Sequence, residues 1–144
     1  MIAAKSHADE IHDFILRVAK SEVFPRLGLE GQSYFESTLR QDIEQILMRD
    51  GGTYLVCFGS ELIGVCGFRH SGHVNHLFVA PEACGKGVGR ILLQQACDYI
   101  AGPIIDLNAS LNSIGFYTRL GFEAVGSPQS AHGVKYQHMS LVKR

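Results

Sequence analysis

The chain has 144 residues, of which 46% are hydrophobic and 19% charged, and its formal net charge is −1 at pH 7. This composition excludes a disordered or fibrous protein, and the balanced charge excludes a general basic surface for nucleic acid. No apolar run approaches the length of a membrane span, and the residues after Met1 lack the organisation of a signal peptide. We therefore expect one domain over residues 1–144, working in the cytoplasm without a nucleic-acid or membrane partner.

Hydrophobic periodicity predicts two helices at the start of the chain. Apolar residues recur at helical spacing over residues 7–20 and again from Phe35 to Leu47. The remaining sequence predicts strands at 53–58, 62–69 and 73–79, a helix at 88–100, a strand at 104–107, a short helix at 113–120 and closing strands at 122–125 and 135–141. This order predicts an α/β fold of the α+β type, with a mixed sheet and helices on its faces.

A glycine-rich loop lies between the third predicted strand and the helix at 88–100. Gly85, Gly87 and Gly89 stand at alternate positions, with Lys86 and Arg90 beside them. Glycine lets a backbone turn tightly and bring its N–H groups against a ligand, and the helix N-terminus adds a positive end. The loop therefore predicts a phosphate or pyrophosphate site. A dinucleotide-binding unit is disfavoured because the spacing is G-x-G-x-G rather than G-x-G-x-x-G, and the P-loop pattern is absent.

Two segments resemble the cofactor-binding motifs of a known superfamily. Residues 81–93, PEACGKGVGRILL, resemble the acyl-CoA loop and helix of the GNAT superfamily of N-acetyltransferases. Residues 108–122, NASLNSIGFYTRLGF, resemble its second CoA segment, with the pattern F-Y-x-x-x-G-F. The resemblance implies a GNAT-like fold, with a mostly antiparallel sheet of about six to seven strands, and acetyl-CoA as the cosubstrate. Cys84 departs from the pattern, since the superfamily usually has Gln or Arg there, and residues 1–4 are short for the expected first strand.

The resemblance also implies roles for individual residues. The backbone of Leu77, Phe78 and Val79 would pair with the pantetheine arm, and an N–H of this stretch would polarise the thioester carbonyl. Tyr117 would protonate the departing CoA thiolate, while Asn112 would anchor the pantetheine arm or cap the helix that follows. The diphosphate would be held by the loop residues Gly85, Lys86, Gly87, Val88, Gly89 and Arg90.

A general base is not evident in the sequence. The third predicted strand offers Asn75 and His76 on the acceptor side, and His73, His132 and His138 are further candidates. The three-residue spacing of the histidines around His73 does not favour a metal site, because alternate strand positions share a face. We therefore expect catalysis without a metal.

These residues together predict an N-acetyltransferase that moves an acetyl group from acetyl-CoA directly to an amine of a small molecule or peptide, in a ternary complex. The alternative is a non-catalytic acyl-CoA-binding or sensor module that uses the same loop. Tyr117 favours the enzyme, and the absence of a clear base favours the module. Residues 20–40 and 126–138 would form the acceptor pocket, and they leave the acceptor open. A homodimer is common in this superfamily and is a further expectation.

Overall fold

The structure is a computed structural model that describes residues 1–143. Its strands are β1 (Gly52–Phe58), β2 (Leu62–Arg69), β3 (His73–Val79), β4 (Ile104–Ser110), β5 (Glu123–Ala124), β6 (Gln129–Ala131) and β7 (Val134–Val142). Its α-helices are α1 (Ala8–Glu22), α2 (Leu29–Ile43), α3 (Val88–Tyr99) and α4 (Ile114–Arg119). Short 3₁₀ turns lie at Lys5–His7, Phe24–Arg26, Pro81–Ala83 and Leu111–Ser113. No helix within residues 1–143 combines the length and the apolar character that crossing a membrane requires.

The strands form one seven-stranded sheet in the order β1-β2-β3-β4-β7-β5, with β6 paired to β7. Every neighbouring pair is antiparallel except β3 and β4, which run parallel because α3 carries the chain across between them. The expected mixed, mostly antiparallel sheet is confirmed. The chain before α1 adds one isolated bridge at the sheet edge, between Ile2 and Leu55.

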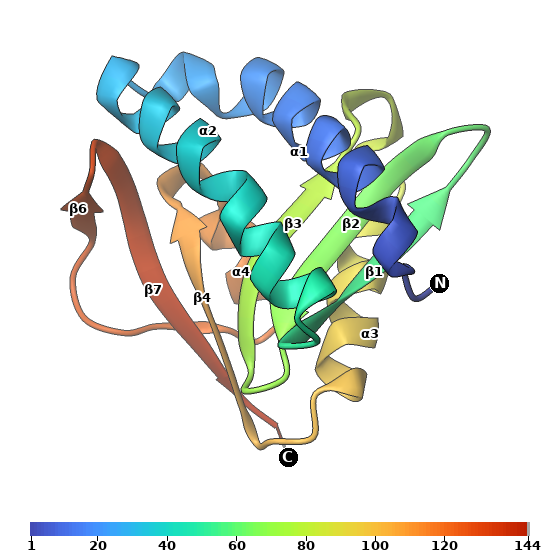
Figure 1. Ribbon diagram of the computed structural model, residues 1–144. Helices are drawn as coiled ribbons and strands as arrows, with labels where there is room; N and C mark the ends of the chain where they lie inside the picture. The colour runs from blue at the N-terminus through green and yellow to red at the C-terminus, as the bar shows by residue number, and fades with distance from the viewer. Residues whose placement is uncertain (144) are drawn as a thin grey trace.

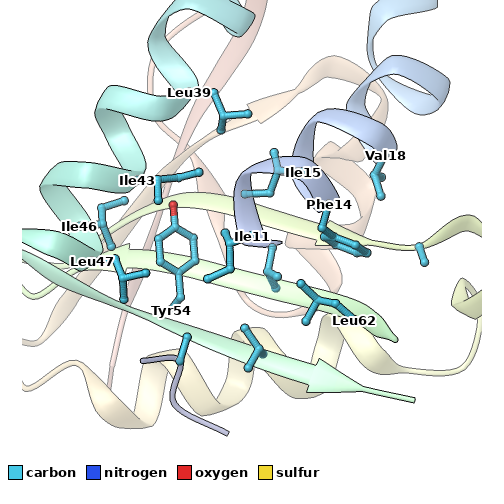
Figure 2. Close-up of a cluster of buried hydrophobic side chains, with 14 of the residues drawn as sticks. Ile11, Phe14, Ile15, Val18, Leu39, Ile43, Ile46, Leu47, Tyr54 and Leu62 are labelled. Carbon is cyan, nitrogen blue, oxygen red and sulfur yellow. The ribbon is translucent and has the colours of Figure 1, made fainter. Parts of the chain in front are cut away.

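Helices cover both faces of the sheet, as Figure 1 shows. The predicted apolar stripes explain this arrangement, because they supply the buried faces of the helices. On one face, α1 and α2 pack Ile11, Ile15 and Leu39 against β1 and β2 (Figure 2). On the other face, α3 packs Leu92 and its neighbours against the sheet, together with α4.

The second predicted helix differs from the observed one at its C-terminal end. α2 stops at Ile43, and residues Glu44–Met48 form a π-helical turn in which the Arg49 N–H donates to the Glu44 carbonyl at 3.0 Å. The wider turn keeps Ile46 and Leu47 buried, so the apolar spacing alone did not reveal it. β6 was also missed, because Gln129–Ala131 lies in a polar loop with no apolar alternation.

Candidate active site

The single parallel strand pair diverges soon after it begins. β3 and β4 pair only at His73–Asp106 and Val74–Leu107, although both strands continue for several residues. Beyond these two pairs lies a cleft of about 1060 Å³. It is lined by the end of α1 and the turn that follows, the end of β3, the glycine loop, the β4–α4 junction and the start of β7. The divergence therefore opens a cavity at the centre of the sheet.

The divergence also frees backbone groups on the edge of β3. The Ala80 N–H donates to the Ile63 carbonyl of β2 at 2.8 Å. Because N–H groups alternate in direction along an antiparallel pair, those of Leu77 and Val79 point away from β2 and toward the cleft. Both residues line the cleft, so this edge offers two N–H donors to an extended ligand.

The glycine loop presents the N-terminus of α3 to the same cleft. Gly85 and Gly87 have φ values of +80° and +81°, a conformation that residues with a Cβ rarely adopt. Their turn starts the helix abruptly at Val88, and the Ile91 N–H closes its first hydrogen bond, to Gly87, at 3.0 Å. The N–H groups before Ile91 have no partner inside the helix, so this end is suited to bind an anion.

Gly89 keeps the space beside the loop open. A Cβ at this position would lie 3.5 Å from Val79 and 3.6 Å from Phe116, so a side chain would occupy the gap between β3 and α4. Arg90 lines the cleft and brings a positive charge to the helix N-terminus, whereas Lys86 is exposed and does not line it.

Tyr117 lines the cleft from α4. Its ring packs edge-on against Phe116 and Phe122, with centroid distances of 5.1 and 5.8 Å. Burial, with a smaller effect of the nearby Cys66 thiol, raises the pKa of the Tyr117 hydroxyl above its ordinary value. The hydroxyl is therefore protonated at neutral pH, and its orientation is fixed by a packed ring.

Asn112 lies in the 3₁₀ turn before α4, is exposed and also lines the cleft. The turn is held by other side chains: the Ser113 hydroxyl donates to the Ser110 carbonyl at 2.9 Å and lies 2.8 Å from the Ser110 hydroxyl. The Asn112 amide is thus not needed for this turn and is available to a ligand.

His76 lies away from the cleft, in the core on the α1 and α2 face. Its Nδ1 is 2.7 Å from the Tyr54 hydroxyl, and the two rings stack at 6.0 Å. Burial, and then the charges of Arg69 and His73, lower the pKa of His76 to about 4. The ring is therefore neutral at pH 7, and its Nδ1 is occupied by the hydrogen bond with Tyr54.

Asn75 forms a β-bulge where β3 leaves β4. In the β2–β3 register, Gly67 faces His76 and Phe68 faces Val74, so Asn75 is the extra residue. Its Oδ1 is buried and has no hydrogen-bond partner, and Asn75 does not line the cleft. The structure brings the predicted cofactor-binding residues except Lys86, together with Tyr117, around the cleft. The candidates for a base, Asn75, His73, His76, His132 and His138, do not line it.

The side of the cleft expected to bind the acceptor is formed by segments that carry no sequence motif. Glu22, Arg26 and Lys135 line it, within the two ranges expected to form an acceptor pocket. Val18 also lines the cleft, and nothing in the sequence marked it, because it has the spacing of a core position in an amphipathic helix.

A contact between α2 and the β6–β7 hairpin closes this side. A Cβ on Gly31 would lie 2.7 Å from the Gly133 carbonyl oxygen, so the two backbones touch. Beside them, the rings of Tyr34 and His132 stack at 4.2 Å with an angle of 3° between their planes. We call these four residues the α2–hairpin bridge.

Comparison with known proteins identifies the family. Residues 23–143 match the acetyltransferase (GNAT) domain. The chain belongs to the GNAT acetyltransferase family. Its sequence is similar to the peptidyl-lysine N-acetyltransferase YjaB of Salmonella typhimurium, 31% identical over 72 residues. That match covers 49% of this chain and 50% of YjaB, so it spans about half of the relative's length.

Solved structures share the GNAT fold of this chain. The GCN5-related N-acetyltransferase of Rhodopseudomonas palustris is 18% identical, with a TM-score of 0.76 over 99% of this chain and 93% of its own. The PaiA N-acetyltransferase of Thermoplasma acidophilum, solved in complex with coenzyme A, is 17% identical, with a TM-score of 0.71 over 97% of this chain and 95% of its own. At these identities the likeness concerns the fold.

Proposed function

We propose that this GNAT protein is an acetyl-CoA-dependent N-acetyltransferase that transfers the acetyl group directly to an amine in a ternary complex. The observation that carries the proposal is the convergence of three elements on one cleft: the free N–H edge of β3, the anion site at the start of α3, and Tyr117.

The cradle at α3 fits the cosubstrate's diphosphate. The free N–H groups of the first turn and the guanidinium of Arg90 would bind the phosphate oxygens. Gly87 provides the turn, and Gly89 leaves room for the ligand. Cys84 is exposed beside this loop and supplies no hydrogen-bonding side chain of the kind expected there, so binding relies on the backbone.

The edge of β3 fits the pantetheine arm. The N–H groups of Leu77 and Val79 would bind its amide carbonyls and the thioester carbonyl, with Asn112 on the opposite side of the cleft. A donor fixed where the carbonyl oxygen becomes negative lowers the barrier by about 3 to 4 kcal/mol. The strand holds this donor in place before the reaction, so no reorganisation is required.

Tyr117 would donate a proton to the departing thiolate. In water this transfer runs uphill, since a tyrosine near pKa 10 is a weaker acid than a thiol near 8.5. Burial raises the pKa of Tyr117 further, but the same dry surroundings also raise the proton affinity of the thiolate. Because its ring is packed on both sides, the Tyr117 hydroxyl would be held in one position, from which it could donate its proton as the C–S bond breaks.

A thiol-release assay tests the proposal. Acetyl-CoA would be incubated with a panel of free amines, amino acids, aminoglycosides and lysine peptides, and the acetylated product identified by mass spectrometry. We expect amine-dependent release that falls about 10²-fold or more in Tyr117→Phe, while acetyl-CoA affinity changes less than threefold by calorimetry. Tyr99→Phe, an exposed tyrosine on α3, should leave both unchanged.

The assay also distinguishes the enzyme from the alternative, a non-catalytic acyl-CoA-binding module. Tight acetyl-CoA binding with no amine-dependent release, in the native chain, would contradict the enzyme and support a binding module. Equal release from the native chain and Tyr117→Phe would leave the transferase standing and remove Tyr117 as its acid.

A further inference from the structure

Two cationic side chains, Arg26 and Lys135, line the side of the cleft expected to bind the acceptor. Arg26 ends the 3₁₀ turn after α1, and Lys135 is the second residue of β7. Both residues are exposed. Within residues 1–143, neither cation forms an ion pair with a carboxylate, since the ion pairs of this part of the chain join other residues. Two positive charges therefore reach the cleft without a carboxylate partner.

The turn that carries Arg26 is held in place by α2. The Gln32 side-chain amide donates to the carbonyls of Phe24 and Leu27, at 3.2 and 3.0 Å. Nη1 of Arg26 donates to the backbone carbonyl of Glu22 at 3.3 Å, across the end of α1. The other guanidinium nitrogens have no hydrogen-bond partner within residues 1–143. The backbone beneath Arg26 is therefore fixed, and most of its guanidinium is available to a ligand.

The α2–hairpin bridge brings Lys135 to the same mouth of the cleft. A Cβ on Gly31 would lie 2.7 Å from the Gly133 carbonyl oxygen and 3.3 Å from the Leu27 Cβ. The turn after α1 and the start of β7 are therefore adjacent at this point. Arg26 directly precedes Leu27, and Lys135 lies two residues after Gly133, about 7 Å along an extended chain. The two cations thus stand on neighbouring walls of one opening.

The charge of these walls is only partly balanced by the protein. Among the residues that line the cleft, within the described chain, Glu22 is the sole carboxylate. The carboxylate of Glu30 lies close to the Gly133 backbone but does not line the cleft. A third cation of the lining, Arg90, belongs to the start of α3 and the expected diphosphate site. The side expected to bind the acceptor therefore has an excess of positive charge.

We propose that the acceptor is an amine that also carries an oxyanion, a carboxylate or a phosphate, and that Arg26 and Lys135 bind this anion. This inference rests on the proposed acetyltransferase function and names the substrate class of its site. A guanidinium offers paired N–H groups that match two oxygens of one anion, and a lysine adds a mobile point charge. The anion would anchor the acceptor at the mouth, so that its amine reaches the thioester at the edge of β3 and the anion takes no part in the reaction.

The test compares acceptors that differ only in the anion. The probes are amino acids with one to five carbons between amine and carboxylate, their carboxamides and the matching aminoalkyl phosphonates. Each kcat/KM is referred to the neutral amine, because the carboxamide also changes the basicity of the amine. We expect the native chain to prefer a carboxylate or phosphonate of one length over its carboxamide by about 10- to 100-fold. The carboxylate and phosphonate arms show which oxyanion the site takes.

Single variants assign the preference to the two cations. Arg26→Gln and Lys135→Gln should each lower kcat/KM about 10-fold or more for the best anionic acceptor and less than threefold for its carboxamide. Acetyl-CoA affinity, measured by calorimetry, should change less than threefold. Lys20→Gln removes an exposed cation of α1 that does not line the cleft, and it should leave all three values unchanged.

A charge reversal provides a gain that a damaged fold cannot produce. The double variant Arg26→Glu with Lys135→Glu should lose the anionic acceptor and prefer a diamine of the same length over the carboxamide. Melting temperature, measured for every variant, reports whether the fold survives.

The outcomes are distinct. Carboxamides accepted as well as carboxylates and phosphonates at every length by the native chain, or equal losses for both kinds of acceptor in the variants, would overturn the anion site. Weaker acetyl-CoA binding in the variants, with the preference for an anionic acceptor retained, would assign the cations to the cosubstrate phosphates and also overturn it. Amine-dependent release in these experiments would leave the transferase function intact. Absence of release from the native chain with every amine would overturn both proposals.

Discussion

The Tyr54 hydroxyl and Nδ1 of His76 share a hydrogen bond of 2.7 Å inside the core between the sheet and α2. Figure 2 shows the Tyr54 ring among the aliphatic side chains of α1 and α2. Burial lowers the pKa of His76 to about 4, so the imidazole in this bond is neutral at pH 7. His76 is therefore part of the hydrophobic core, and its charge state links stability to pH.

We predict that the free energy of unfolding decreases as the pH is lowered from 6.5 to 4, because His76 is protonated more readily in the unfolded chain. Its pKa is 6.5 in the unfolded chain and about 4 in the folded chain, so below pH 6.5 the unfolded state binds the proton more readily. The contribution is complete above pH 6.5, is lost as the pH falls from 6.5 to 4, and reaches about 3 kcal/mol. Urea unfolding between pH 7 and pH 4 measures it. A His76→Leu chain should show a shallower decline, and an identical decline would contradict the prediction.

A double-mutant cycle isolates the Tyr54–His76 bond. Tyr54→Phe removes the hydroxyl and leaves the buried Nδ1 without a partner, which should cost about 1 to 3 kcal/mol. In the double variant Tyr54→Phe with His76→Leu, both polar groups are gone, so the cost of the second change should be much smaller. Chemical denaturation of the four chains gives the coupling. Strict additivity would mean that the bond contributes little.

His76 lies in the core beside Tyr54, whereas the sequence suggested a position on the acceptor side of the cleft. A bulge in β3 explains the difference. Alternation along β3 places every second residue on one face, but Val74 packs on the α3 face and His76 on the α1 and α2 face. The extra residue Asn75 reverses the alternation. A bulge leaves no mark in the pattern of polar and apolar residues, so a core histidine and a cleft histidine could not be distinguished from the sequence.

The glycine turn and the start of α3 could be predicted because the local sequence determines them. The positive φ values at Gly85 and Gly87 require glycine, and the start of α3 follows directly. The acceptor side depends on contacts between distant segments, such as α2 with the β6–β7 hairpin. Neither Tyr34 nor His132 carries a local signal, so their stacking was not predictable.

Gly89→Ala should separate cosubstrate binding from stability. The added methyl meets Val79 and Phe116 at ordinary contact distances, and alanine favours a helix by up to about 1 kcal/mol over glycine. We expect unchanged or higher unfolding free energy together with weaker acetyl-CoA binding, because the methyl occupies the gap beside the loop. Calorimetry and thermal unfolding measure the two effects.

Gly87→Ala is the matched comparison for that change. Its φ of +81° strains any residue with a Cβ, so we expect the chain to lose about 1 to 2 kcal/mol of stability as well as affinity. If Gly89→Ala bound acetyl-CoA as tightly as the native chain, the gap beside Gly89 would not belong to the cosubstrate site.

Gly31→Ala should weaken the α2–hairpin bridge. A glycine inside a helix is normally unfavourable, so alanine would stabilise α2 in isolation. Here its Cβ would lie 2.7 Å from the Gly133 carbonyl oxygen, which is backbone and must move. We expect a net loss of about 1 to 3 kcal/mol and faster hydrogen exchange in β6. Gly102→Ala, whose Cβ meets nothing within 4 Å, is the control. A higher unfolding free energy in Gly31→Ala would contradict the prediction, because it would mean that the Gly133 backbone moves aside at little cost.

The divergence of β3 from β4 leaves an open strand edge inside a folded protein, and open edges are where other chains attach and aggregate. Here the exposed run is short, since only the N–H groups of Leu77 and Val79 face the cleft. Pairing between strands of different molecules needs a run of about six residues, and the α2–hairpin bridge crosses one side of the opening. The short length of this edge and the bridge beside it therefore protect the protein from aggregation through strand pairing at the cleft.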